Sequence, residues 1–320
     1  MNRGSATNVV RIGLSAAIVS VADENPCVLA MHHADGAHGL PFGPFDPLRH
    51  RTLESGLRTW VREQTYLDLD YAEQLYTFGD RGRHLVKSGE GPRVVSVGYL
   101  ALVRATGELK APDTQWQDWY SYFPWEDWRS AKPGIIEAVI LPALTDFAKS
   151  GASPAQNKLR RQRVALCFGQ DGIAWDEERT LERYELLYEA GLVEEARRDG
   201  RSKASLLPSS ALGANMIFDH RRILATAIAR LRGKMKYRPV VFELMPPMFT
   251  LLELQRTVEA ISGIRLHKQN FRRLVEGQGL VERVGKFASA SRGRPAELFR
   301  FRREVLSERP SPGLRLGTRR

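Results

Sequence analysis

A cluster of polar side chains that could bond to bases and phosphates stands near the C-terminus. Its members are Lys268, Gln269, Asn270, Arg272 and Arg273. These residue types donate to base edges in the major groove and to phosphate oxygens. Phe271, Leu274 and Val275 recur between them at helical spacing, which places the polar residues on the outside of a helix over about 267–278. We therefore predict a nucleic-acid recognition helix.

A preceding helix is expected to hold the recognition helix in place. Thr250 and Glu253 have the spacing of a capping box, in which each side chain bonds to the other residue's backbone amide. Ser262 and Gly263 end this helix. Its apolar face comprises Leu251, Leu254, Val258 and Ile261. Two consecutive helices joined by a short glycine-containing turn predict a helix-turn-helix.

A basic hairpin follows the two helices. Residues 280–284 and 296–301 form its expected strands, and the tip between them contains Arg292 and Arg294. A narrow arginine-rich tip can enter the minor groove, where the negative potential attracts arginine. The order of helix, helix and basic hairpin predicts a winged helix over 233–305. The alternative is a surface helix followed by a solvated charged hairpin.

Composition supports two domains and a polyanionic partner. The chain has 320 residues and a formal net charge of +11, which favours nucleic acid, an anionic membrane surface or a phosphorylated ligand. Cys27 and Cys167 are the only cysteines, so neither a disulfide framework nor a zinc finger organises the fold. No apolar run approaches the roughly 20 residues that span a bilayer. We expect a cytoplasmic protein.

The N-terminal part predicts an α+β domain. Residues 9–31 are expected to form a hairpin of two strands, although 12–22 also imitates a signal peptide; its alternating apolar residues favour the strand. An amphipathic helix is expected from Leu53 to Gln64. The β-branched run 93–103 is the strongest strand signal.

The middle of the chain combines an aromatic-rich segment with several expected helices. Residues 113–130 hold four tryptophans, which could stack on an adenine ring, line a dimer interface or pack in the core of an inserted helix pair; core packing is favoured. The other expectations are a helix over 134–149, a loop over 149–160, a strand over 164–168, one or two helices over 176–198, and a helix stopped by Gly233.

Several motifs of both halves resemble one family. They are Leu75–Asp80, Arg93–Val103, Phe242–Leu244, Phe249–Gln255, Asn270–Arg273 and Gly293–Ala296. The chain resembles the Nudix-related transcriptional regulators of NAD metabolism, over about residues 8–105 and 216–303. The aromatic insert Trp119–Trp128 looks more like the alphaproteobacterial NadQ-type branch, which is related to the NrtR regulators.

This resemblance implies an architecture and a function. The architecture is a Nudix-like α/β/α sandwich over 1–232 with an insertion at about 113–213, a winged helix over 233–305, and a flexible basic tail over 306–320. The implied function is repression of NAD synthesis or salvage genes by a homodimer on a palindromic operator. An adenine nucleotide (ATP, NAD or ADP-ribose) is the implied effector, and its binding would release the DNA.

The Nudix catalytic motif is degenerate. A Nudix hydrolase binds magnesium through several glutamates of one helix, because magnesium prefers octahedral oxygen ligands. When the motif is laid on this chain, Thr59 and Arg62 take two of those glutamate positions and His50 takes the upstream one. Only Glu63 remains as a carboxylate. We expect that hydrolase activity is lost and ligand binding kept; an active pyrophosphatase is the alternative.

Arginines near this motif could bind phosphates without a metal ion. The candidate ligand-binding residues are Arg49, Arg51, Arg58, Glu63, Arg81 and Arg83. Any one of these arginines could equally be a solvated surface residue. The neighbouring His32, His33 and His38 lack a convincing further ligand, so no metal site and no required cofactor are predicted.

Overall fold

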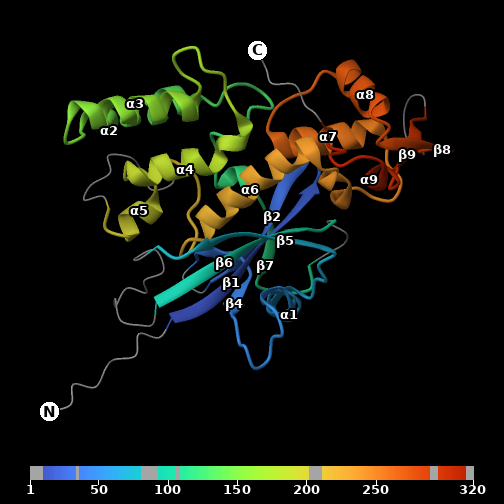
Figure 1. Ribbon diagram of the computed structural model, residues 1–320, viewed down its shortest axis with the longest axis horizontal. Coiled ribbons are helices and arrows are strands. Elements are labelled where there is room, and N and C mark those ends of the chain that lie inside the picture. Colours follow the sequence, from blue (N-terminus) through green and yellow to red (C-terminus); the bar gives the residue numbers. More distant parts are fainter. Residues whose placement is uncertain are drawn as a thin grey trace.

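The structure is a computed structural model of the 320-residue chain, and it describes residues 10–33, 36–80, 93–104, 109–201, 211–288 and 295–314. Within these ranges, seven strands form one sheet, and two more form a separate C-terminal hairpin. The sheet strands are β1 (Val10–Ala22), β2 (Asn25–His32), β3 (His38–Gly39), β4 (Phe42–Pro44), β5 (Tyr71–Phe78), β6 (Arg93–Leu102) and β7 (Thr114–Asp118). Figure 1 shows helices on both sides of this sheet.

Strand β1 is the centre of the sheet. It runs parallel to β6 and antiparallel to β2 and β4, and the main order is β3-β2-β1-β6-β5. Asp23 and Glu24 form the β1–β2 turn with positive φ at both residues, the backbone of a tight hairpin turn. The predicted hairpin over 9–31 and the predicted central strand over 93–103 are thus confirmed.

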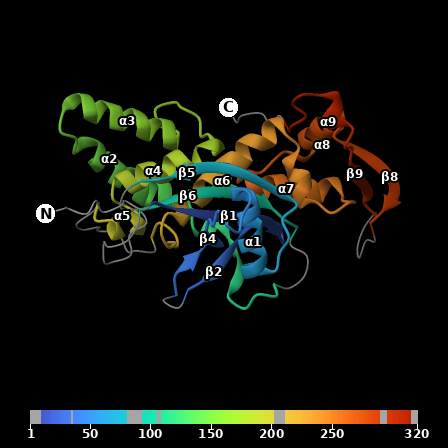
Figure 2. The same cartoon turned by 60° about the horizontal axis from the view of Figure 1, so that its bottom comes forward.

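Alternate residues of β1 face two different helices. Leu14, Ala16 and Ile18 pack in the cluster that includes the buried side of α1 (Leu53–Thr65). Ala17 and Val19 belong to the cluster that includes α6 (His220–Tyr237). Because side chains of a strand point alternately to opposite faces, one apolar strand serves both layers. Figures 1 and 2 show the resulting order of α1, sheet and α6.

The middle region differs from its predicted form in three places. Segment 114–118 pairs with β2 as β7, so the expected insertion at about 113–213 begins with a strand of the sheet. The predicted loop over 149–160 and the predicted strand over 164–168 are wrong, because helix α3 runs from Pro154 to Phe168.

Local capping explains helix α3. The Ser153 hydroxyl accepts from the amide of Gln156, Pro154 occupies the first turn, and Gly169 ends the helix in the left-handed conformation. The other elements of the middle region are η1 (Trp119–Ser121), η2 (Ile136–Ile140), α2 (Leu141–Lys149), η3 (Glu177–Arg179), α4 (Thr180–Glu189) and α5 (Glu194–Arg198). The helices predicted over 134–149 and 176–198 are confirmed.

Helix α6 does not stop at Gly233, as predicted, but continues to Tyr237. A Cβ at Gly233 would lie 2.8 Å from the Glu178 carboxylate, so this glycine admits a neighbouring side chain rather than ending the helix. The expected boundary between residues 232 and 233 therefore falls inside α6.

The C-terminal module has the predicted order of helix, helix and hairpin. After η4 (Val240–Leu244), its elements are α7 (Leu251–Ser262), α8 (Lys268–Gly277), β8 (Val281–Phe287), β9 (Glu297–Phe301) and α9 (Val305–Glu308). The Thr250–Glu253 capping box is present, and Gly263 ends α7 with positive φ. Phe249 bridges to Phe299, which ties the entry to α7 to the hairpin.

The tail expected to be flexible from residue 306 is ordered as far as residue 314. Leu314 is fully buried, and its amide donates to the Met235 carbonyl at 2.7 Å. Gly313 lies against the backbone of Lys236 and Tyr237, where a Cβ would not fit. The chain thus returns from the C-terminal module to the end of α6. Residues 315–320 lie outside the described ranges.

Candidate functional site

Helix α8 presents the polar face predicted from the sequence. Phe271 and Val275 are buried, which turns the rest of the helix outward. Residues Lys268, Gln269, Asn270, Arg272 and Arg273 are all exposed. His267, at the N-cap, makes no side-chain hydrogen bond to the first turn. The first-turn amides, which have no partner inside the helix, are thus left without a side-chain cap.

The exposed face of α8 carries uncompensated positive charge. Arg273 donates to the Asn270 side-chain oxygen at 3.3 Å, a contact between a cation and a neutral group. Within the described part of the chain, the side chains of Lys268, Gln269 and Arg272 make no hydrogen bond or ion pair. Glu276 lies near the far end of the helix and is 3.8 Å from Arg283 of β8. The face can therefore meet an external anion at little cost in internal contacts.

Glu259 of α7 fixes the turn that leads into α8. Its side chain is 3% exposed and accepts from the Leu266 amide at 2.9 Å and from Arg265 at 2.7 Å. Burial by itself raises the pKa of this carboxyl, but the bonds from Gln255, Leu266 and Arg265 outweigh burial, and the pKa is lowered. An ionised Glu259 thus holds the turn two residues before α8 begins.

The hairpin β8–β9 follows α8 as predicted. Glu282 of β8 pairs with Arg300 of β9 at 2.5 Å across the ladder, and Arg283 lies 3.6 Å from Glu297. The proposed wing-tip arginines, Arg292 and Arg294, lie outside the described residues, so their role stays a prediction.

The ligand-binding candidates on and near α1 differ from the exposed residues of α8, because carboxylates or carbonyls of the same chain lie beside some of them. Arg58 donates to Glu54 at 2.8 and 2.9 Å and to the Leu69 carbonyl. The Arg58 guanidinium thus already has internal partners. Arg49 lies 3.8 Å from Glu63. Arg51 is exposed, and Arg81 and Arg83 lie outside the described residues.

The donor set on α1 does not fit a magnesium ion. Glu63 is the carboxylate at the motif positions, and Arg49 is its partner. The neighbouring Arg62 pairs with Asp68 at 2.6 Å and stands where a metal-binding glutamate would be. Cations at these positions repel a divalent metal, and octahedral coordination would need several more oxygens. Among the described residues, no group of three His, Cys, Asp or Glu could hold a metal ion.

His50 replaces the upstream glutamate and is built into the fold. It is 5% exposed, and its Nδ1 accepts from the Asp46 amide at 3.2 Å. Helix α1 is held on β4 by Trp60, which donates to the Pro44 carbonyl at 2.8 Å. A Cβ at Gly43 would meet the Trp60 ring, so the close contact of helix and strand requires glycine there.

The aromatic segment packs in the core, as favoured, but as a strand and a short 3-10 turn rather than as a helix pair. Trp119 and Trp125 are fully buried.

The three neighbouring histidines, His32, His33 and His38, lie in and beside β2 and β3. His32 bonds to Gln115 at 3.0 Å, and His38 bonds to the Tyr122 hydroxyl at 2.7 Å. Burial lowers the pKa of His38, and the charge of His32 lowers it further.

Comparison with known proteins identifies the C-terminal module. Residues 241–301 match the family described as the NrtR DNA-binding winged helix domain. This module is an NrtR-type winged helix. A curated relative, the "ADPR responsive transcriptional repressor NtrR" of Acinetobacter baylyi, is 44% identical over 91 residues. That match covers 28% of this chain and 36% of the relative, so the chain matches about a third of the relative's length.

Solved structures resemble nearly the whole chain in fold. The NrtR of Shewanella oneidensis, in complex with a 27mer DNA, aligns with a TM-score of 0.52 and 20% identity, covering 92% of this chain and 95% of that one. A MutT/nudix family protein from Enterococcus faecalis aligns with a TM-score of 0.52 and 15% identity, covering 92% and 87%. The Nudix-like fold and the NrtR-type winged helix agree with the resemblance found in the sequence.

Sequence reasoning missed a set of polar residues between the sheet and the winged helix. Tyr120 and Arg129 lie in the aromatic segment, and Arg232 lies in α6. Each bonds to a backbone carbonyl far away in the sequence. Since no local pattern marks such contacts, only the fold could reveal them.

Across the described residues, no helix is long and apolar enough to span a bilayer.

Proposed function

We propose that this protein is a DNA-binding transcriptional repressor whose DNA affinity is controlled by a nucleotide bound to the Nudix-like domain. The observation that carries the proposal is the exposed face of α8, which combines hydrogen-bonding amides with cations that have no carboxylate partner among the described residues. Its place in an NrtR-type winged helix supports the assignment of α8 as the recognition helix. Lys268, Gln269, Asn270, Arg272 and Arg273 bind the DNA.

The wing adds a second contact. Arg292 and Arg294 belong to the connection between β8 and β9, and in this proposal they bind the adjacent minor groove. The protein acts as a homodimer, so its operator is a palindrome with half-sites about 10 or 20 base pairs apart, one or two helical turns. The controlled genes are those of NAD synthesis or salvage.

ADP-ribose is the first candidate for the effector, because the relative with the 44% identical segment is named as responsive to it. NAD and ATP share its adenosine diphosphate portion and are the alternatives. Arg49, Arg51, Arg81 and Arg83 are the proposed phosphate ligands. Arg58 and Glu63 belong to the same proposed ligand-binding site, although Arg58 is held by Glu54 and Glu63 lies beside Arg49. Release of the DNA is the proposed response.

The Nudix-like domain binds its ligand without hydrolysing it in this proposal. The support is the donor set of α1, in which Arg62 and Thr59 stand at glutamate positions and Glu63 is 3.8 Å from Arg49. Incubation of the protein with magnesium and ADP-ribose should give no AMP at an enzymatic rate. Turnover at an ordinary rate, about 1 per second or faster, would show that the domain is an active pyrophosphatase instead.

Fluorescence anisotropy on DNA tests the main proposal. DNA from upstream of the host's NAD-synthesis genes is titrated at a fixed salt concentration, because phosphate contacts make the affinity salt-dependent. ADP-ribose, NAD and ATP are then added in turn. We expect specific binding that one nucleotide weakens. Binding no tighter than to unrelated DNA would reject the repressor, and binding that ignores all three nucleotides would reject nucleotide control.

A further inference from the structure

The C-terminal end of α7 is capped by groups from outside the winged helix. The last carbonyls of any helix lack partners inside it, so these groups must bond elsewhere when they are buried. Three donors reach this end of α7, two from the aromatic segment and one from α6. They are the Tyr120 hydroxyl to Ala260 O at 2.7 Å, the Trp128 amide to Gly263 O at 2.7 Å, and Arg232 Nε to Ile261 O at 2.8 Å.

The aromatic segment that provides two of these donors is continuous with the sheet. Its strand β7 pairs with β2 from Cys27 opposite Asp118 to Met31 opposite Thr114. Directly after the strand, the Asp118 carboxylate accepts from the Tyr120 amide at 2.9 Å and fixes the start of the turn. We name residues 118–129 the junction segment. One end of it belongs to the sheet, and the other end holds α7.

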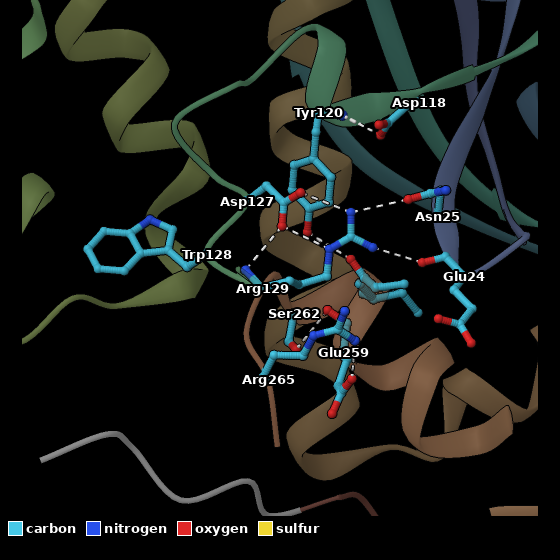
Figure 3. A network of polar contacts seen from close by, with 12 residues as sticks. Glu24, Asn25, Asp118, Tyr120, Asp127, Trp128, Arg129, Glu259, Ser262 and Arg265 are labelled. Carbon is cyan, nitrogen blue, oxygen red and sulfur yellow. Dashed lines mark hydrogen bonds and ion pairs between the residues drawn. The ribbon is translucent and has the colours of Figure 1, made fainter. Parts of the chain in front are cut away.

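Arg129 ties the junction segment to the β1–β2 turn (Figure 3). Its guanidinium forms a bidentate pair with Asp127 at 2.8 and 2.9 Å. It also donates to the Glu24 carbonyl at 2.8 Å and to the Asn25 side chain at 3.2 Å. The carboxylate of Glu24 lies 3.6 Å from Arg256 of α7. The hairpin turn, the junction segment and the winged helix therefore meet at one place.

Strand β1 connects this meeting place with the α1 side of the sheet. Its residues 13–15 pair with β4, the strand on which α1 is held, and its last residue leads into the turn that Arg129 holds. At about 3.3 Å per residue, the 13 residues of β1 span roughly 40 Å. Strand β1 is therefore a direct backbone connection between β4 and the turn that Arg129 holds beside α7.

The end of α7 in turn sets the position of α8. Glu259, one turn before Gly263, accepts from the Leu266 amide, and α8 begins at Lys268. The Ser262 hydroxyl donates to the Val258 carbonyl at 2.7 Å and closes the last turn of α7. Figure 3 shows these side chains below the Tyr120 and Arg129 contacts. A continuous path of packed polar contacts thus joins the sheet to the recognition helix.

We propose that the junction segment couples ligand binding in the Nudix-like domain to the orientation of α8, with Tyr120 and Arg129 as positioning residues. This inference rests on the proposed nucleotide control of DNA binding. Neither residue is among the proposed ligands of the DNA or the nucleotide. Each holds one of the two links of the path: Tyr120 links the segment to α7, and Arg129 links it to the β1–β2 turn.

The test measures the coupling factor, the ratio of the DNA dissociation constants with and without saturating ADP-ribose. Coupling between two sites typically gives a factor of about 5–150. Tyr120→Phe removes one hydroxyl, and Arg129→Met removes the guanidinium bonds. In the full chain, each variant should reduce the coupling factor at least about 5-fold, toward one. Calorimetry should show that ADP-ribose binds each DNA-free variant within about 3-fold of the wild type.

Matched controls separate coupling from general loosening of the fold. Tyr188→Phe removes a buried hydroxyl that donates to Asp199 at 2.8 Å, away from the junction segment. Arg163→Met breaks the ion pair at 2.6 Å between Arg163 of α3 and Glu189 of α4. Both controls should keep the wild-type coupling factor.

Two failures are distinguishable. If the wild type responds to ADP-ribose and both junction variants retain its coupling factor, this inference is overturned while the proposed repressor stands. The inference is also overturned if the two controls lose coupling as strongly as the junction variants. If wild-type DNA affinity is the same with and without each of ADP-ribose, NAD and ATP, the proposed nucleotide control itself is rejected, and the coupling path is rejected with it.

Discussion

Arginines are in opposite electrostatic environments in the core and on α8. In the core, Glu126 is 1% exposed and lies 2.6 Å from both Arg183 and Arg232, so every charge of the cluster has an internal partner. On α8, Arg272 is exposed and Arg273 contacts only a neutral amide among the described residues. A compensated arginine stabilises the fold, whereas an uncompensated one is available for an external anion.

Helix α1 lies between these two extremes. Its arginines are on the surface, like those of α8, but carboxylates of the same chain lie beside them, as in the core. Arg58 pairs with Glu54, and Arg62 pairs with Asp68. Exposed pairs of this kind contribute about 0–1 kcal/mol. The loss of a charge should therefore have its largest effect in the core, a smaller effect on α8 and the smallest effect on α1.

The largest effect is expected from Glu126→Gln. The substitution leaves two buried guanidinium groups without a counter-charge, and breaking a buried ion pair costs about 3–5 kcal/mol. Urea unfolding near neutral pH should show this loss in the free energy of unfolding. Glu189→Gln, which affects a half-exposed pair with Arg163, is the control and should cost about 1 kcal/mol or less. Equal losses in the two variants would remove the distinction between core and surface.

The Glu126 effect should depend on pH. Burial by itself raises the pKa of Glu126, but Arg183 and Arg232 outweigh it, and the pKa in the folded protein lies below the ordinary 4.5. The ionised cluster therefore stabilises the fold above about pH 4.5, and this contribution is lost as the pH falls through the lowered pKa. The difference between wild type and Glu126→Gln should shrink on acidification. A constant difference down to acid unfolding would contradict the assignment.

An intermediate effect is expected from Arg272→Ala, which should weaken specific DNA binding by about 1–3 kcal/mol. The control is Arg62→Ala on α1, an arginine that is also exposed but is paired with Asp68. It should leave DNA affinity unchanged in the absence of nucleotide. Anisotropy at one salt concentration measures both variants. If Arg62→Ala weakened binding as much as Arg272→Ala, the presence of a carboxylate partner would not distinguish the two surfaces.

The smallest effect is expected at the Arg58–Glu54 pair. A double-mutant cycle of Arg58→Met and Glu54→Gln should give a coupling energy of about 0.3–0.5 kcal/mol in unfolding, typical of exposed pairs four residues apart. Arg58 also donates to the Leu69 carbonyl, so the single Arg58 variant should cost more than the single Glu54 variant. A coupling energy of several kcal/mol would move α1 into the same class as the core cluster.

The C-terminal module was predictable because its signals are local. The capping box at Thr250, the glycine after Ser262 and the apolar spacing around Phe271 each act within a few residues, and all agree with the structure. The same local rules failed at α3, where an apolar run over 164–168 suggested a strand. There, the cap at Ser153 lies eleven residues upstream and extends the helix through that run.

Gly233 shows a different limit of sequence patterns. A glycine in a basic stretch is typical of a helix end, and the sequence holds no sign of the Glu178 carboxylate that occupies the space beside it. The ordered residues up to Leu314 are a similar case. A flexible tail is expected from residue 306, but the fold brings Leu314 to Met235.

The sequence by itself determined the hairpin of β1 and β2 and the order of elements in the C-terminal module, because helix caps, strand alternation and the residues of α8 depend on nearest neighbours along the chain. Tertiary structure decided which charges are free. Whether an arginine such as Arg58 or Arg272 can bind a phosphate depends on a carboxylate or carbonyl placed beside it by the fold. It also decided the contacts of Tyr120 and Arg129, because their partners are backbone carbonyls, which every residue has and no sequence pattern marks.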